Sequence, residues 1–265
     1  MNIFLKELRS HRKSLIFWSI GVFLMVVSGM AKYDAYSSSG QSINDLVADL
    51  PKSLRAVLGF GAVDLSKISG YYAMLFLYLL LMATIHAAML GATIIAKEER
   101  DKTFEFLFVK PVSRTTIITA KLMAAFVNIV VFNLVTYFSS IILIAKYNDG
   151  EAVNGDIAIL MVGMFILQLL FMVIGSALAA VKKKPKTAAS LATGILLLTY
   201  MLSIAIDLNE HIEGLKYLTP FKYFEAKNIM FGGGLDIIFV VISAVLIALL
   251  SYVTYVFYQK RDLNV

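Results

Sequence analysis

Six long apolar runs constrain the fold of this chain more than any other feature of its sequence. Each run has about 17 to 31 residues, and roughly 20 apolar residues are enough for an α-helix to cross a bilayer. Inside a bilayer the backbone must satisfy its own hydrogen bonds, so each run predicts a helix. The sequence therefore predicts an all-α membrane protein, a single domain over residues 1–265. Its six transmembrane helices should span about residues 14–30, 70–96, 115–145, 157–181, 187–206 and 235–258.

The charged residues are distributed unevenly between the apolar runs. A net charge of +6 could indicate nucleic-acid binding, but the basic residues cluster in short connecting segments, a pattern typical of membrane topology. Sixteen of the 24 Lys and Arg residues lie in segments 1–13, 97–121, 182–186 and 259–265. Because positive residues favour the cytoplasmic side, both termini are predicted to be cytoplasmic. The absence of cysteine excludes a disulfide framework, thiol catalysis and Cys-ligated zinc.

The N-terminal residues 1–13 have an amphipathic pattern. Phe4 and Leu8 share one helical face and basic residues cover the others, which predicts a helix lying along the inner membrane surface. An ordinary basic start to a membrane anchor fits equally well. Cleavage of the first apolar run as a signal peptide is disfavoured, because five further spans follow. In the loop 32–69, apolar spacing on both sides of Pro51 predicts two short amphipathic helices that pack on the outer membrane surface or on the bundle.

The stretch between the second and third apolar runs has a different composition. Nine of the eighteen residues in 97–114 are charged, a density that no membrane core tolerates. Phe104, Leu107 and Phe108 nevertheless recur at helical spacing. This pattern predicts a short amphipathic helix over about residues 98–110, outside the bilayer, which Pro111 would end.

Four stretches carry a resemblance to a known family. They are Glu98-Glu99-Arg100-Asp101-Lys102-Thr103-Phe104-Glu105 with Pro111-Val112-Ser113-Arg114; Pro51, Leu54, Leu58-Gly59 and Ser69-Gly70-Tyr71; Thr219-Pro220-Phe221-Lys222-Tyr223-Phe224; and Lys260-Arg261-Asp262-Leu263. In their order along the chain, around six spans, these stretches resemble ABC-2 type transporter permeases, the membrane subunits of many bacterial exporters. Lys102 departs from the family pattern, which usually has Gly at that position.

The resemblance implies a fold and a set of partners. The fold would be six transmembrane helices of the ABC-2 (type V exporter) type, with an N-terminal interfacial helix, a cytoplasmic coupling helix and short extracellular helices. A non-catalytic permease in the bacterial plasma membrane would pair with two copies of a separate ATPase, which bind ATP and Mg, and with a second permease chain in a homodimer or heterodimer. Membrane lipids would surround it. The sequence agrees in having no G-x-x-x-x-G-K-[ST] phosphate loop. ATPase docking would involve Glu98, Glu99, Arg100, Thr103, Phe104, Glu105, Leu107 and Phe108, with Phe4 and Leu8 nearby.

Several polar residues fall within or near the predicted spans. Such residues are candidates for a translocation pathway, although hydrogen bonds between helices are the favoured interpretation for the Asn and Gln side chains. Lys121 is expected to reach the inner surface along its own aliphatic chain. A lone His is poor evidence for metal, so no metal site is predicted. Ala83, Ala87 and Gly91 predict a ridge of small residues against another helix. The candidate pathway residues are His86, Asn128, Asn133 and Gln168.

Two other functions are alternatives to ATP-driven export. An intramembrane enzyme of the CAAX-protease type would use a pair like Glu98-Glu99, but Thr103 stands where that family has Arg. A passive channel or ion carrier is disfavoured because no carboxylate lies deep in a predicted span. The expected cargo is amphipathic or hydrophobic, such as an antimicrobial or cytolytic peptide or a peptide antibiotic, so the exporter could confer antibiotic resistance.

Overall fold

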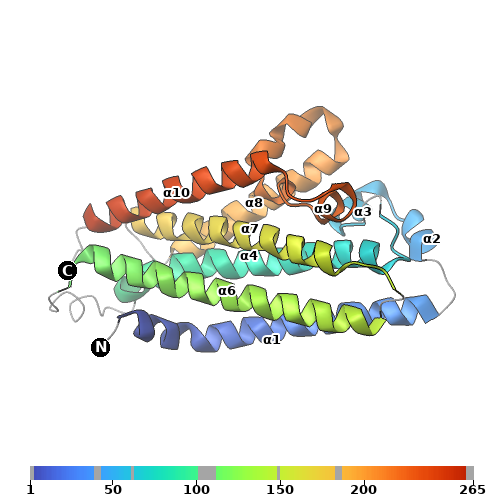
Figure 1. The fold of residues 1–265 in the computed structure, drawn as a ribbon. Coiled ribbons are helices and arrows are strands. Elements are labelled where there is room, and N and C mark those ends of the chain that lie inside the picture. The colour runs from blue at the N-terminus through green and yellow to red at the C-terminus, as the bar shows by residue number, and fades with distance from the viewer. Residues whose placement is uncertain are drawn as a thin grey trace.

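The computed structural model describes residues 3–38, 43–60, 63–100, 112–147, 150–182 and 187–260. Within these ranges every regular element is helical (Figure 1). The elements are α1 (Ile3–Ser38), α2 (Ile43–Ala48), α3 (Lys52–Val57), α4 (Ile68–Arg100), α6 (Arg114–Tyr147), α7 (Asn154–Val181), α8 (Ala188–Leu208), η2 (Glu210–Leu218), η3 (Pro220–Lys222), α9 (Ala226–Gly232) and α10 (Ile237–Lys260).

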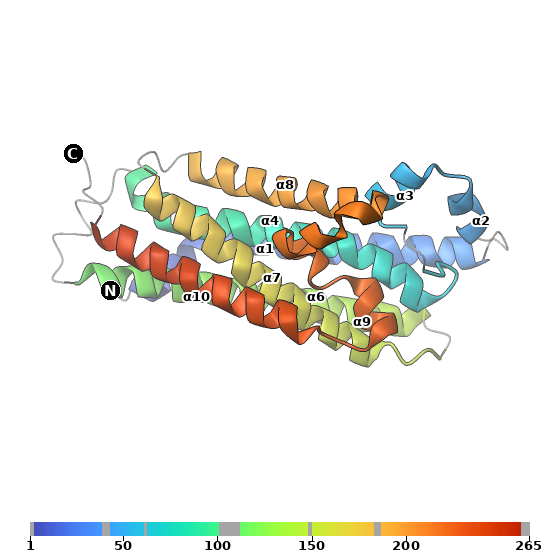
Figure 2. The same ribbon diagram turned by 90° about the horizontal axis from the view of Figure 1, so that it is seen from above.

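Six of the described helices are long and apolar enough to cross a membrane, as the six apolar runs predict: α1, α4, α6, α7, α8 and α10. They run side by side along one direction in two perpendicular views (Figures 1 and 2). Apart from α1, each begins and ends within about four residues of its predicted span. The apolar runs therefore set the architecture of the chain.

Helix α1 differs from the sequence expectation. It runs unbroken from Ile3 to Ser38, so residues 3–13 and the first span form one helix. This continuity is what a basic start to a membrane anchor predicts, whereas a separate surface helix requires a break near residue 13. At 1.5 Å per residue the 36 residues extend for about 54 Å, against about 30 Å for the bilayer core. Part of α1 must therefore project beyond the hydrocarbon.

The bundle has two distinct ends. At one, here called the terminal end, α1 begins, α4 ends, α6 begins, α7 ends, α8 begins and α10 ends (Figures 1 and 2). The other, here called the cap end, carries the short elements α2, α3, η2, η3 and α9. The described residues of the basic clusters lie on elements that begin or end at the terminal end, so the charge asymmetry along the chain is also an asymmetry in space.

The core of the bundle is the seam between α4 and α7, the most extensive helix pair among the described residues. About two thirds of the most apolar part of α4 is buried, against 17% for α10. A Cβ added at Gly91 would lie 2.0 Å from the Met172 carbonyl oxygen, and one added at Gly175 would lie 2.3 Å from that of Ala88. The predicted ridge of small residues therefore packs backbone against backbone.

The cap is held to the bundle by specific contacts of its short helices. Pro51 precedes the first residue of α3, where its fixed φ favours helix initiation. Thr219 donates its hydroxyl proton to the Thr199 carbonyl oxygen at 2.7 Å, and Tyr223 stacks on Phe239 with 4.7 Å between ring centroids. These contacts fix the cap against α8 and α10.

Candidate functional site

Three helices converge on the carboxylate of Glu7 near the terminal end of the bundle. Glu7 lies on α1 and is only 1% exposed. Its Oε1 is 3.8 Å from Nζ of Lys121 on α6, and its Oε2 is 3.7 Å from Nζ of Lys97 on α4. His11, one turn further along α1, brings Nε2 to 3.8 Å from Oε2. A single acidic residue therefore links the start of α1 to α4 and α6.

The two lysines reach this junction in different ways. Lys121 is fully buried and also donates to the Ile94 carbonyl oxygen at 2.5 Å. The expectation that it extends to the membrane surface is therefore wrong, because its charge is satisfied inside the protein. Lys97 is partly exposed and donates to the Ser10 hydroxyl. One sign of this site is visible in the sequence, because Glu7 is the only acidic residue among the first 33.

The first turn of α6 is anchored at the terminal end of the bundle. The Ser113 hydroxyl accepts from the Thr116 backbone N–H at 3.1 Å and so caps the helix. Arg114 donates from Nη1 to the Gln259 carbonyl oxygen at 2.8 Å, and Gln259 returns a bond from Nε2 to the Thr115 hydroxyl at 2.9 Å. The start of α6 is thus tied to the last turn of α10.

The predicted docking residues are only partly described by the structure. Helix α4 continues through Glu98, Glu99 and Arg100, so these three extend the second span rather than beginning a new helix. Phe4 and Leu8 are half-buried against the apolar core formed by residues of α4, α6 and α7. The apolar face that these two residues share is therefore used for packing within the chain. The remaining predicted residues lie outside the described ranges: Thr103, Phe104, Glu105, Leu107 and Phe108.

The four candidate pathway residues are all involved in packing between or along helices. His86 is 3% exposed and stacks on Phe132 at 5.0 Å between ring centroids. Asn133 of α6 donates from Nδ2 to Gln168 Oε1 at 3.2 Å and to the Met161 carbonyl oxygen at 3.1 Å, both on α7. Their role in a pathway stays a prediction. The fourth residue, Asn128, donates from Nδ2 to the carbonyl oxygen of Ala124 on its own helix at 2.7 Å.

A comparison with protein families identifies the family of this chain. A family model described as ABC-2 family transporter protein matches residues 1–263, nearly the whole chain. The chain belongs to the ABC-2 transporter family. A comparison with curated proteins found no match. As an ABC-2 permease with six apolar helices, it is a multi-pass membrane protein and the transport component of an ABC transporter. Family membership implies partnership with an ABC ATPase and a generally non-catalytic role for the permease.

Two stretches that carried the resemblance have structural roles in this permease. In Pro111-Val112-Ser113-Arg114, the serine caps α6 and the arginine binds α10. In Leu58-Gly59, the glycine ends α3 with a φ of +74°. Within the described residues, no group of three His, Asp or Glu residues is placed to hold a metal ion.

Proposed function

We propose that this ABC-2 permease is the membrane subunit of an ATP-driven exporter. Two copies of a separate ATPase would bind ATP and Mg and supply the energy, and a second permease chain, identical or related, would complete the pathway. Family membership supports the proposal, as does the absence of a phosphate loop from the sequence. The energy for transport would then enter through a contact with the partner ATPase.

The observation that carries this proposal is the ion-paired junction at Glu7. The proposed docking segment, residues 98–110, begins in the last residues of α4 and precedes α6 in the chain, and both helices are linked to α1 through Glu7. A displacement of the segment would therefore act on three helices together. Rigid-body tilting of packed helices is a common way to switch between two conformations. Phe104, Leu107 and Phe108 would be the buried anchors in the ATPase.

Orientation and cargo follow from the charges and from the spans. The described residues of the basic clusters lie at the terminal end, so we place this end and both termini in the cytoplasm of a bacterial cell. The spans are strongly apolar and hold few charges, which suits an amphipathic or hydrophobic cargo better than a hydrated sugar. A peptide, such as an antimicrobial peptide or peptide antibiotic, is the cargo we favour.

The docking proposal is tested by capture of the ATPase. Replacing Phe104 and Leu107 together with Asp should leave the chain in the membrane but abolish co-purification of the ATPase and its stimulated ATP hydrolysis. The reason is that two charges would be placed in an apolar contact. Phe106→Asp is the matched control, since residue 106 points away from the 104–107–108 face of a helix.

The control should retain capture and hydrolysis close to those of the unmodified chain. Equal capture by the double variant would contradict the docking role of the segment. Equal loss in both variants would show that the apolar face is not the contact.

A further inference from the structure

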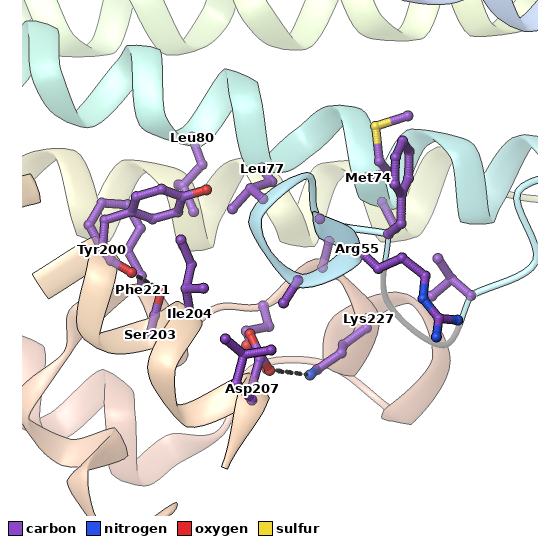
Figure 3. A pocket seen from close by; sticks show the side chains of 18 of the residues that line it. Arg55, Met74, Leu77, Leu80, Tyr200, Ser203, Ile204, Asp207, Phe221 and Lys227 are labelled. Atoms are coloured by element: carbon purple, nitrogen blue, oxygen red, sulfur yellow. Dashed lines mark hydrogen bonds and ion pairs between the residues drawn. The ribbon is translucent and has the colours of Figure 1, made fainter. Parts of the chain in front are cut away.

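The cap end contains a cavity that has no part in the proposed transport function. A cavity of about 780 Å³ opens between α3, α4, α8 and the segment that begins α9 (Figure 3). Ligand pockets for small molecules typically measure about 300–1,000 Å³. The cavity is therefore large enough to bind a small ligand, and its lining indicates the kind.

One side of the cavity is a closed set of ion pairs. Buried Lys222 binds Asp207 Oδ1 at 2.6 Å and also binds Glu225. Lys227 lies 3.4 Å from Asp207 and 3.3 Å from Glu225. Burial disfavours the charge of Lys227, but the two carboxylates outweigh burial and raise its pKa. Both acidic residues of the lining are thus already neutralised by lysines.

The other side has positive charge without a matching carboxylate. Lys52 and Arg55 line the cavity from α3, three residues apart, and among the described residues neither forms an ion pair. The Arg55 Nε is buried and has no hydrogen-bond acceptor. A buried donor left unsatisfied costs about 1–3 kcal/mol, more when it is charged. An anion is the ligand that would complete this side of the cavity.

Arg55 is held in place by the way α3 ends. Gly59 adopts a positive φ, and the backbone N–H groups of Gly59 and Phe60 donate to the carbonyl oxygens of Ala56 and Arg55, the Schellman arrangement. The Tyr78 hydroxyl donates to the Leu58 carbonyl oxygen at 2.8 Å. The short helix that carries the guanidinium is therefore attached to α4 rather than free to swing away.

The wall of the cavity that α4 forms is apolar. Met74, Leu77 and Leu80 project from α4, and Ile204 projects from α8 (Figure 3). The three α4 side chains are spaced three residues apart and therefore form one continuous apolar stripe. A free inorganic anion would leave this stripe without a partner, whereas a molecule with an apolar chain would cover it.

We propose that this cavity binds an amphipathic anion, with a carboxylate or phosphate head on Arg55 and Lys52 and an apolar chain along the α4 stripe. The guanidinium fork suits such heads because it can donate two parallel hydrogen bonds. The site faces the end of the molecule remote from the ATPase-docking segment, and equilibrium binding there does not depend on the proposed function.

The experiment uses the full chain in phosphatidylcholine nanodiscs, without ATPase. Palmitic acid carrying a diazirine in its chain is photocrosslinked and the modified peptides are mapped. We expect labelling in α3, α4 and α8 that is displaced by unlabelled palmitate but not by hexadecanol or inorganic phosphate. Arg55→Gln should weaken binding about tenfold or more, as loss of a charge-assisted hydrogen bond predicts. Lys52→Gln should weaken it less, because Lys52 is exposed.

Lys67→Gln is the control, an exposed lysine at the same end that does not line the cavity. It should bind as the unmodified chain does. Displacement by hexadecanol as effective as by palmitate would overturn the anion requirement, and displacement by phosphate alone would overturn the apolar one. Labelling elsewhere, or equal binding by Arg55→Gln and Lys67→Gln, would overturn the site. Lys52 is exposed, so Lys52→Gln should fold normally. It therefore tests the need for positive charge in the cavity even if Arg55→Gln fails to fold.

Discussion

At the scale of single residues, Glu7 is the position where the loss of one charge should lower the stability of the chain most. Glu7→Gln removes the charge but keeps the shape, and it leaves the fully buried Lys121 without its carboxylate. Breaking a buried pair by removing one partner costs about 3–5 kcal/mol. We therefore expect a clear fall in the thermal unfolding temperature of the purified chain in detergent.

The matched control is Glu213→Gln, which removes a carboxylate paired with Lys216 at 2.9 Å on the exposed cap. That pair is open to solvent, so the unfolding temperature should hardly change. Equal effects of the two substitutions would mean that Glu7 has no special structural role.

The sequence could not predict this junction, for a physical reason. Glu7 and Lys121 are separated by more than a hundred residues, and pairing at that distance leaves no periodic pattern in either segment. The same holds for the cavity, whose lining comes from several elements far apart in the chain. The favoured interpretation of Asn133 and Gln168, by contrast, needed only their polarity within apolar runs.

At the scale of elements, the seam between α4 and α7 depends on glycine rather than on large side chains. Gly91→Ala would place a methyl group 2.0 Å from the Met172 carbonyl oxygen, so the two helices must separate. Overpacking of this kind typically costs about 1–3 kcal/mol. Thermal unfolding in detergent should show a marked loss of stability.

The same substitution at Gly194 on α8 is the control, since an added Cβ there meets nothing within 4 Å. Gly194→Ala should leave the protein unchanged or stabilise it by up to about 1 kcal/mol, because Ala favours a helix more than Gly. A Gly91→Ala variant as stable as Gly194→Ala would show that the helices pack more loosely than described.

The helices themselves were predictable where an apolar run has clear polar boundaries. The spans that became α6 and α8 match within two residues at each end, because charged or polar residues stop the apolar pattern sharply. Helix α1 extends beyond the predicted span 14–30 at both ends, since a helix continues through charged residues once it has left the hydrocarbon. Hydrophobicity marks the membrane-embedded part of a helix rather than the whole helix.

At the scale of the whole molecule, the two ends should be separated by the membrane. The natural absence of cysteine makes single-cysteine labelling possible without further changes. In intact cells, a membrane-impermeant maleimide should label cysteines placed at Lys52 and Glu213, at the cap end. It should reach those at Lys13 and Lys110 only after the cells are opened. Labelling of Lys110→Cys from outside would reverse the proposed orientation and remove its basis for ATPase docking.

The length of α4 has a consequence for how the two ends of this permease communicate. The same continuous helix supplies the apolar stripe at Leu77 and reaches Arg100, about 35 Å away, where the proposed docking segment follows. Because α4 is one continuous helix, a tilt at one of its ends also moves the other end. If a ligand in the outer cavity and the nucleotide on the ATPase each favour one tilt of α4, the two binding events are thermodynamically linked, and each alters the affinity of the other by the same factor.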